Sequence, residues 1–197
     1  MAPLRATMIS LFAILFPMAA AAGEVVGHTV EVKGSAIAQA GSLRRSLGAS
    51  SNLELDDTVL TGANAKLSAV LGTSTKLFLS GDARLVIDRY VAGVGGNLVL
   101  SSGALLVDAA AKSFRKPLTV TSPYGIVGIR GTRFFAGTIG ETFGVFCASG
   151  RVTVAAGGRT VLLAAGQGVD IPRRGAPPGP VRAWGAAKIA RALALVR

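Results

Sequence analysis

The feature that most restricts the fold of this chain is an alternation of polar and apolar residues that recurs across residues 25–171. Segment 29–33, Thr-Val-Glu-Val-Lys, shows it, and segment 84–88 repeats it. Side chains alternate between the two faces of a strand, so these segments predict β-strands with one buried face. Glycines such as Gly81 and Gly103 divide the segments, as strand-to-strand turns require. We therefore predict an all-β fold, either a short β-solenoid or a twisted β-sandwich.

The first 22 residues have the pattern of an export signal. Arg5 supplies a positive start, an apolar run follows, and Ala20 to Ala22 are small residues that signal peptidase accepts. The run from Met8 to Ala22 has 15 residues, whereas a membrane-spanning helix needs about 20. We expect a signal peptide over residues 1–22, cleaved near Ala22, and a periplasmic location. An uncleaved membrane anchor is the alternative.

The character of the chain changes after residue 171. Residues 172–182 are rich in Pro and Gly and predict a linker, because proline cannot join a sheet interior. Residues 183–197 predict a basic C-terminal helix or tail with a partial apolar face that includes Trp184 and Leu193. The pattern leaves open whether this segment docks on the body, frays, or contacts an anionic membrane.

The formal net charge of +11 is concentrated near the C-terminus, where residues 172–197 hold six basic residues and no acidic ones. Outside the cytoplasm, such a surface favours an acidic patch on an envelope protein, an anionic polysaccharide or a membrane surface as partner. Nucleic acid is not expected, because aromatic residues that could stack on bases make up only 6% of the chain.

The sequence contains few residues suited to catalysis. His28 and Cys147 are the only residues of their types, so Cys147 cannot form an intrachain disulfide, and we interpret His28 as lacking a Cys or carboxylate at ligand spacing. Apolar neighbours indicate that Cys147 is a buried strand residue, and His28 is expected at the surface. Asp56 and Asp57 more simply open a turn than hold a cation with Glu54. We therefore predict no catalytic, cofactor or metal site and no enzyme activity.

Two glycine-containing segments have further interpretations. Residues 93–96 could suggest a nucleotide loop, but no helix follows, which favours a hairpin loop. In the segment around Gly131, Arg130 and Arg133 could form an anion-binding fork. Alternatively, Gly131 adopts a special backbone conformation and Arg130 makes internal contacts.

Several ordered motifs across residues 25–171 resemble the FecR domain family. They are Thr-Ser-Pro-Tyr-Gly-Ile-Val-Gly-Ile-Arg-Gly-Thr-Arg-Phe at 121–134, a strand–Ser–Gly–strand pattern at 142–154, and Leu-Ala-Ala-Gly-Gln at 163–167. An upstream segment, 55–65, resembles another family motif. The positions that match the family signature, for which a structural role comes first, are Tyr124, Gly125, Gly128, Arg130, Gly131, Thr132, Phe134, Gly150, Gly166 and Gln167. The acidic residue usual in the family before the second-motif glycine is Ser149 here.

The resemblance implies an extracytoplasmic β module that binds or signals rather than catalyses. We expect a periplasmic protein-binding or signalling module. One alternative is a polysaccharide-binding or surface-associated envelope protein. Another is a membrane-anchored regulator of sigma-factor signalling, which requires that residues 1–22 stay uncleaved.

Overall fold

The computed structural model describes residues 23–110, 114–129 and 131–197. The expected signal peptide, residues 1–22, and Arg130 lie outside the described residues. Within them the chain forms eighteen strands and one helix. The all-β architecture predicted from the alternation is therefore confirmed.

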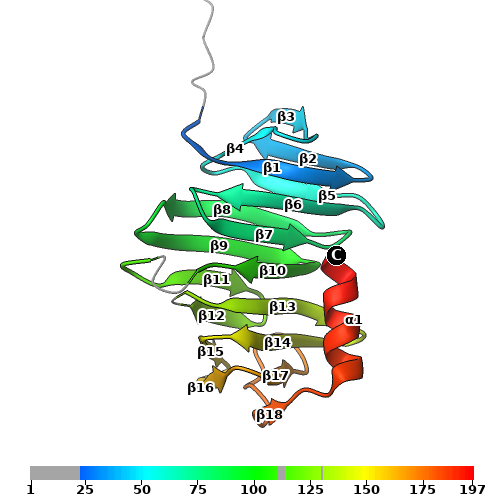
Figure 1. Ribbon diagram of the computed structural model, residues 1–197. Coiled ribbons are helices and arrows are strands. Elements are labelled where there is room, and N and C mark those ends of the chain that lie inside the picture. The colour runs from blue at the N-terminus through cyan, green and yellow to red at the C-terminus, as the bar shows by residue number, and fades with distance from the viewer. Residues whose placement is uncertain (1–22, 111–113, 130) are drawn as a thin grey trace, which may run out of the picture.

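The strands form two sheets of nine strands each. In each sheet the strands follow one another along the long axis of the molecule (Figure 1). In spatial order, sheet A contains β18 (Arg182–Ala183), β17 (Gln167–Ile171), β14 (Thr142–Ser149), β13 (Arg133–Ile139), β10 (Ala104–Asp108), β7 (Thr75–Leu79), β6 (Lys66–Leu71), β1 (Val25–Lys33) and β4 (Asn52–Glu54). Sheet B contains β16 (Arg159–Ala164), β15 (Arg151–Ala156), β12 (Gly125–Ile129), β11 (Leu118–Ser122), β9 (Gly95–Ser102), β8 (Arg84–Val91), β5 (Thr58–Thr61), β2 (Ala36–Ala40) and β3 (Leu43–Ser46).

The chain passes back and forth between the two sheets as it moves along the stack. The hairpin β6–β7 belongs to sheet A, β8–β9 to sheet B, β13–β14 to sheet A and β15–β16 to sheet B. Strands β9 and β11 pair in parallel, whereas the hairpin partners pair antiparallel. The fold thus combines both predicted alternatives, a layered sandwich and a solenoid-like advance of the chain.

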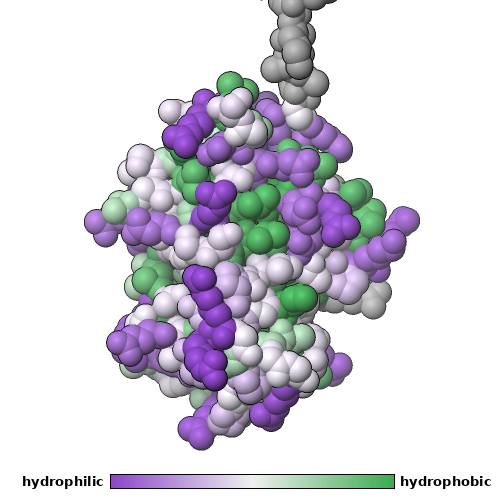
Figure 2. Space-filling model, turned by 180° about the vertical axis from the view of Figure 1, so that it is seen from behind, coloured by the Kyte–Doolittle hydropathy of each residue, from purple (hydrophilic) through white to green (hydrophobic). Residues whose placement is uncertain are grey.

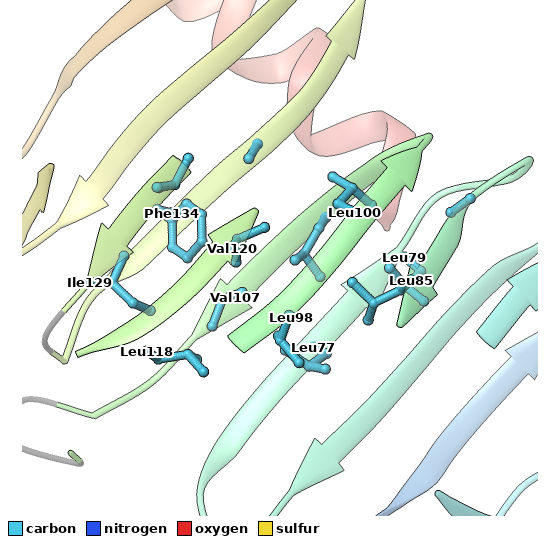
Figure 3. Close-up of a cluster of buried hydrophobic side chains, with 14 of the residues drawn as sticks. Leu77, Leu79, Leu85, Leu98, Leu100, Val107, Leu118, Val120, Ile129 and Phe134 are labelled. Atoms are coloured by element: carbon cyan, nitrogen blue, oxygen red, sulfur yellow. The ribbon is translucent and has the colours of Figure 1, made fainter. Parts of the chain in front are cut away.

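The main core lies between the two sheets (Figure 3). Leu79 and Phe134 project into it from sheet A, and Leu98 and Leu118 project from sheet B. These side chains are all buried. The alternation in the sequence therefore corresponds to one row of side chains per strand that enters this core.

A second, smaller apolar cluster lies on the outer face of sheet A. Helix α1 (Ala186–Val196) packs there against β7, β10 and β13. Its Ala192 and Val196 are buried together with Leu106 and Phe135. Of the alternatives that the sequence left open for this segment, the structure shows docking. No helix within the described residues is long and apolar enough to cross a membrane.

Trp184 anchors the start of this helix. Its ring stacks on Phe146 with 5.2 Å between the centroids. The indole also lies so close to Gly168 that a Cβ built there would be 2.3 Å from Nε1 of Trp184. The Lys188 ammonium lies 4.2 Å from the centroid of the indole ring and 2.5 Å from an oxygen of Asp170. The missing side chain of Gly168 therefore makes room for the residue that holds the helix.

The Pro- and Gly-rich segment 172–182 lies against the end of the sandwich. Ala176 is part of the main core. Nη1 of Arg159 in β16 lies 3.4 Å from the carbonyl oxygen of Pro178, to which it donates a hydrogen bond. The end of the segment contributes to β18, which pairs with β17. The segment thus closes this end of the stack.

Candidate functional site

The first group of signature residues lies in and around the β11–β12 hairpin. The Tyr124 ring stacks on Phe143, with centroids 4.6 Å apart and ring planes 7° from parallel. Gly125 and Gly128 belong to β12, and Phe134 is fully buried in β13. Tyr124 thus packs the β11–β12 turn against β14 of sheet A, and Phe134 fills the core between the sheets, which favours a structural role for these two residues.

A second group brings two turns into contact. Gly131 and Gly150 both have positive φ values, 68° and 83°. A Cβ on Gly150 would lie 2.6 Å from Cγ2 of buried Thr132. Arg133 has its Nε 3.8 Å from an Asp108 oxygen. Gly131 thus has the special conformation expected from the sequence.

The proposed fork of Arg130 and Arg133 is represented in the structure only by Arg133. Its partner in the described part of the chain is the Asp108 carboxylate. Arg130 lies outside the described residues. The anion-binding interpretation therefore gains no support from Arg133.

We expect Gly150→Ala to lower the free energy of unfolding by about 2–3 kcal/mol, from left-handed backbone strain and from overpacking against Thr132. Gly166→Ala is the matched control, because Gly166 has a φ of 82° and no atom within 4 Å of a built Cβ. Gly166→Ala should lower the free energy of unfolding only by the cost of the left-handed backbone, about 1 kcal/mol. Urea denaturation measures both. Thr132→Ser removes Cγ2 and should partly rescue Gly150→Ala, whereas equal losses in the two glycine variants would contradict the contact.

The third group of signature residues lies at the end of β16. The Gly166 N–H donates to the Cys147 carbonyl oxygen at 2.8 Å. The Ala164 N–H donates to Oε1 of Gln167 at 2.9 Å. The Gln167 side chain thus accepts a hydrogen bond from the backbone N–H of Ala164, the last residue of β16.

The sequence contains two candidate reactive groups, the Cys147 thiol and the His28 imidazole. Cys147 is buried in β14, and burial raises the pKa of its thiol, which disfavours the nucleophilic thiolate. His28 is exposed in β1. Among residues 23–110, 114–129 and 131–197, no three His, Cys, Asp or Glu side chains are grouped so that they could hold a metal ion.

A partly buried ionic cluster was not predicted from the sequence. Nη2 of Arg45 donates to both carboxylate oxygens of Asp57, at 2.9 and 2.7 Å, and lies 3.3 Å from a Glu54 oxygen. The Glu54 N–H donates to the same Asp57 carboxylate at 2.8 Å. Asp57 does follow the expected turn, but its side chain fastens β3 to the β4–β5 connection. The pattern of residues carries no signal that Arg45, on another strand, is the partner.

The hollow beside the end of helix α1 is lined in part by Glu31, Lys66 and Phe78. One of the cations that line it is already engaged, because Nζ of Lys66 donates to the Ala194 carbonyl oxygen at 3.0 Å. Lys66 thereby satisfies a carbonyl in the last turn of the helix. This hollow is accounted for by helix docking.

The sheets end in four edge strands that differ in length and protection. Sheet A ends in β4, with three residues, and β18, with two. Sheet B ends in β3, with four residues, and β16, with six. Short strands and charged side chains protect an edge against pairing, and β3 contains Arg44 and Arg45. After Arg159, β16 continues as Thr-Val-Leu-Leu-Ala without charge or proline, so it is the least protected edge.

Two observations define which backbone groups of β16 face outward. Gly157 and Gly158, with φ values of 49° and 75°, form a two-residue hairpin turn closed by the pair Ala156 and Arg159. Pairs next to such a turn are hydrogen-bonded across the ladder, so the next outward residue is at position 160 and the following one at position 162. The bond from Ala164 to Gln167 agrees with this register.

The outward residues of β16 are accessible. The side chains of Thr160 and Leu162 are exposed, Leu162 by 59%. Within the described part of the chain, no backbone hydrogen bond from outside the β15–β16 ladder reaches either residue. Figure 2 shows the face turned away in Figure 1. On this face, groups of hydrophobic side chains alternate with groups of hydrophilic ones. The exposed and unpaired residues of β16 make this edge the candidate interaction site.

The layered β architecture and the turn signature define the type of domain. The family model described as FecR protein matches residues 57–153. The chain therefore carries a domain of the FecR family, as the sequence motifs indicated. No curated protein matches the chain.

Two solved structures share the fold. Both are crystal structures of a protein assigned as an anti-sigma factor from Parabacteroides distasonis, with TM-scores of 0.57 and 0.56 and 12% identity. Each match covers 68% of this chain and 62% of the other. The matched region is thus less than two thirds of that protein, and at this identity the likeness concerns the fold.

Proposed function

We propose that this FecR-domain protein is an exported, non-catalytic module that binds a protein partner in the cell envelope and takes part in signalling. The FecR domain and the fold shared with an anti-sigma factor support the signalling role. The observation that carries the binding role is the accessible edge of β16, because an unpaired strand edge offers main-chain groups to another protein.

Export with cleavage after Ala22 is supported by the surroundings of Gly23. Its backbone nitrogen lies 3.0 Å from Oε2 of Glu54. Cleavage there would convert this nitrogen into an ammonium group next to a carboxylate, an exposed ion pair of modest strength. N-terminal sequencing of the exported protein tests this, with Gly23 as the expected first residue. An intact Met1 in the membrane fraction would favour the anchored alternative.

Leu162→Pro tests the binding role. Proline removes only the outward N–H, so the ladder with β15 stays intact and stability should stay within about 1 kcal/mol of the unchanged chain. We expect it to abolish cross-linking in cells to a partner that the unchanged protein cross-links. The partner is then identified by mass spectrometry and its binding measured with purified proteins.

Leu162→Ala is the matched control, because it shortens the side chain but keeps the N–H. It should weaken binding only a few-fold, since main-chain bonds supply much of the affinity in strand addition. If the proline variant folds normally and binds the partner as well as the unchanged protein does, the β16 edge is not the binding site.

A further inference from the structure

The charge around the open edge indicates what kind of segment it accepts. From Arg151 to Lys188, which lies in the first turn of helix α1, the chain holds six basic residues and one acidic residue, Asp170. Asp170 is already paired with Lys188 at 2.5 Å. The end of the stack formed by β15 to β18 therefore has a large excess of positive charge, which attracts acidic partners.

We propose that β16 pairs with an acidic, extended segment of a different protein. This inference rests on the proposed function and names its partner class. Residues 160 and 162 supply the main-chain hydrogen bonds, and Leu162 supplies an exposed apolar contact. The basic residues around the edge select acidic side chains on the added strand.

Arg151 is the basic residue best placed for this selection. It pairs with Ala164 in the β15–β16 register, so both side chains lie on the same face of sheet B. Ala164 is small and lies between Arg151 and the open edge. An arginine side chain extended across it faces the next residue on an added strand. Arg159, at the other end of β16, is exposed and completes a strand flanked by positive charge.

Gln167 limits the length of the pairing. Its Oε1 already accepts the Ala164 N–H. An added strand therefore finds free main-chain groups at positions 160 and 162 and meets an occupied donor at 164. Since alternate residues of a strand face the partner, the paired part of the segment is about five residues long.

A second copy of this chain is a poorer occupant. The other edge of sheet B, β3, carries the exposed Arg44, which would bring positive charge to a positive edge. Like charges on adjacent strands are destabilising. Pairing of β16 with β16 would likewise bring together two copies of the basic end. The charge pattern thus favours a partner that differs from this protein.

Binding of synthetic peptides to the full chain after export tests the proposal. The probe is a fluorescein-labelled octapeptide of alternating glutamate and valine, with a lysine–valine octapeptide as its counterpart, followed by fluorescence anisotropy. We expect the acidic peptide to bind at least about tenfold more tightly than the basic one. Raising NaCl from about 50 mM to about 0.5 M should weaken the binding several-fold.

Variants separate main-chain pairing from charge. Leu162→Pro should reduce the affinity for the acidic peptide at least about tenfold, as should Thr160→Pro, which guards against a folding defect in one variant. The charge reversal Arg151→Glu should also reduce it by about tenfold. The matched change Arg84→Glu, on a central strand, should leave it nearly unchanged.

The other outcomes each overturn the proposal. Equal binding of both peptides would show that the edge does not select acidic segments. In that case the proposed function would still be supported if Leu162→Pro abolished cross-linking to the partner in cells. Binding of dextran sulfate that competes with the peptide and is unaffected by both proline variants would indicate a polysaccharide site. Self-association seen by sedimentation and lost in Leu162→Pro would identify a second copy as the occupant.

Discussion

Asp57→Ala is expected to lower the free energy of unfolding by about 3 kcal/mol at pH 7, because it removes one partner of a buried ion pair. The Asp57 side chain is fully buried, whereas that of Arg45 is 26% exposed. The change leaves the Arg45 guanidinium and the Glu54 N–H without their shared acceptor. Urea denaturation followed by circular dichroism measures the loss.

Glu31→Ala is the control for this prediction. Glu31 forms an ion pair with Lys33 at 3.3 Å, but both side chains are more than half exposed. Exposed pairs contribute about 0–1 kcal/mol, so this variant should unfold almost as the unchanged protein does. If Asp57→Ala also shows a change below about 1 kcal/mol, the cluster does not hold the first strands together.

Gly168→Ala is expected to displace Trp184 and loosen helix α1. The added Cβ would meet three atoms of the indole ring at 2.3 to 2.8 Å. Gly168 does not have a positive φ, so the effect comes from this contact and not from backbone strain. Overpacking of this kind costs about 1–3 kcal/mol.

Fluorescence reads this change directly, because Trp184 is the only tryptophan of the chain. We expect the emission to shift to longer wavelength and the helical signal in circular dichroism to fall. Gly48→Ala is the control, since a Cβ there meets no atom within 4 Å. An unchanged emission spectrum in Gly168→Ala would show that the position of the helix does not depend on the close approach of Trp184 to Gly168.

The β-strands could be predicted because each depends on local pattern. Alternation identified segments such as 84–88, and glycines at positions 103 and 150 marked turns that need a positive φ. The C-terminal helix was also predicted, but its place on the outer face of sheet A was not. The docking position of the helix depends on Leu106 and Phe135, which lie on the outer face of sheet A in β10 and β13. Local sequence does not show whether such residues are exposed or covered by another element.

The candidate site could not be predicted for a related reason. Residues 159–164, Arg-Thr-Val-Leu-Leu-Ala, form a short apolar run that is compatible with one more strand. Their position at the edge of sheet B follows from the spatial order of nine strands, which local patterns do not contain. The role of Gln167 likewise depends on a hydrogen bond to Ala164 that forms only once the β16–β17 turn is made.

The residues that identify the family and those proposed to bind the partner are thus largely different. The signature positions near Thr132 and Tyr124 pack turns and layers together. The proposed binding groups are main-chain atoms of β16, which side-chain motifs do not specify. This division explains how one FecR framework could serve partners of differing sequence.

Hydrogen exchange at the β16 backbone, measured by NMR on the full exported chain with and without the acidic octapeptide, tests the central claim most directly. If β16 is the binding edge, the amides of Thr160 and Leu162 exchange rapidly in the free protein and become protected when the peptide binds. Amides of the central strand β10 should be protected in both states. Protection that appears instead at β3, or no change at positions 160 and 162 when the peptide is bound, would show that β16 is not the binding edge.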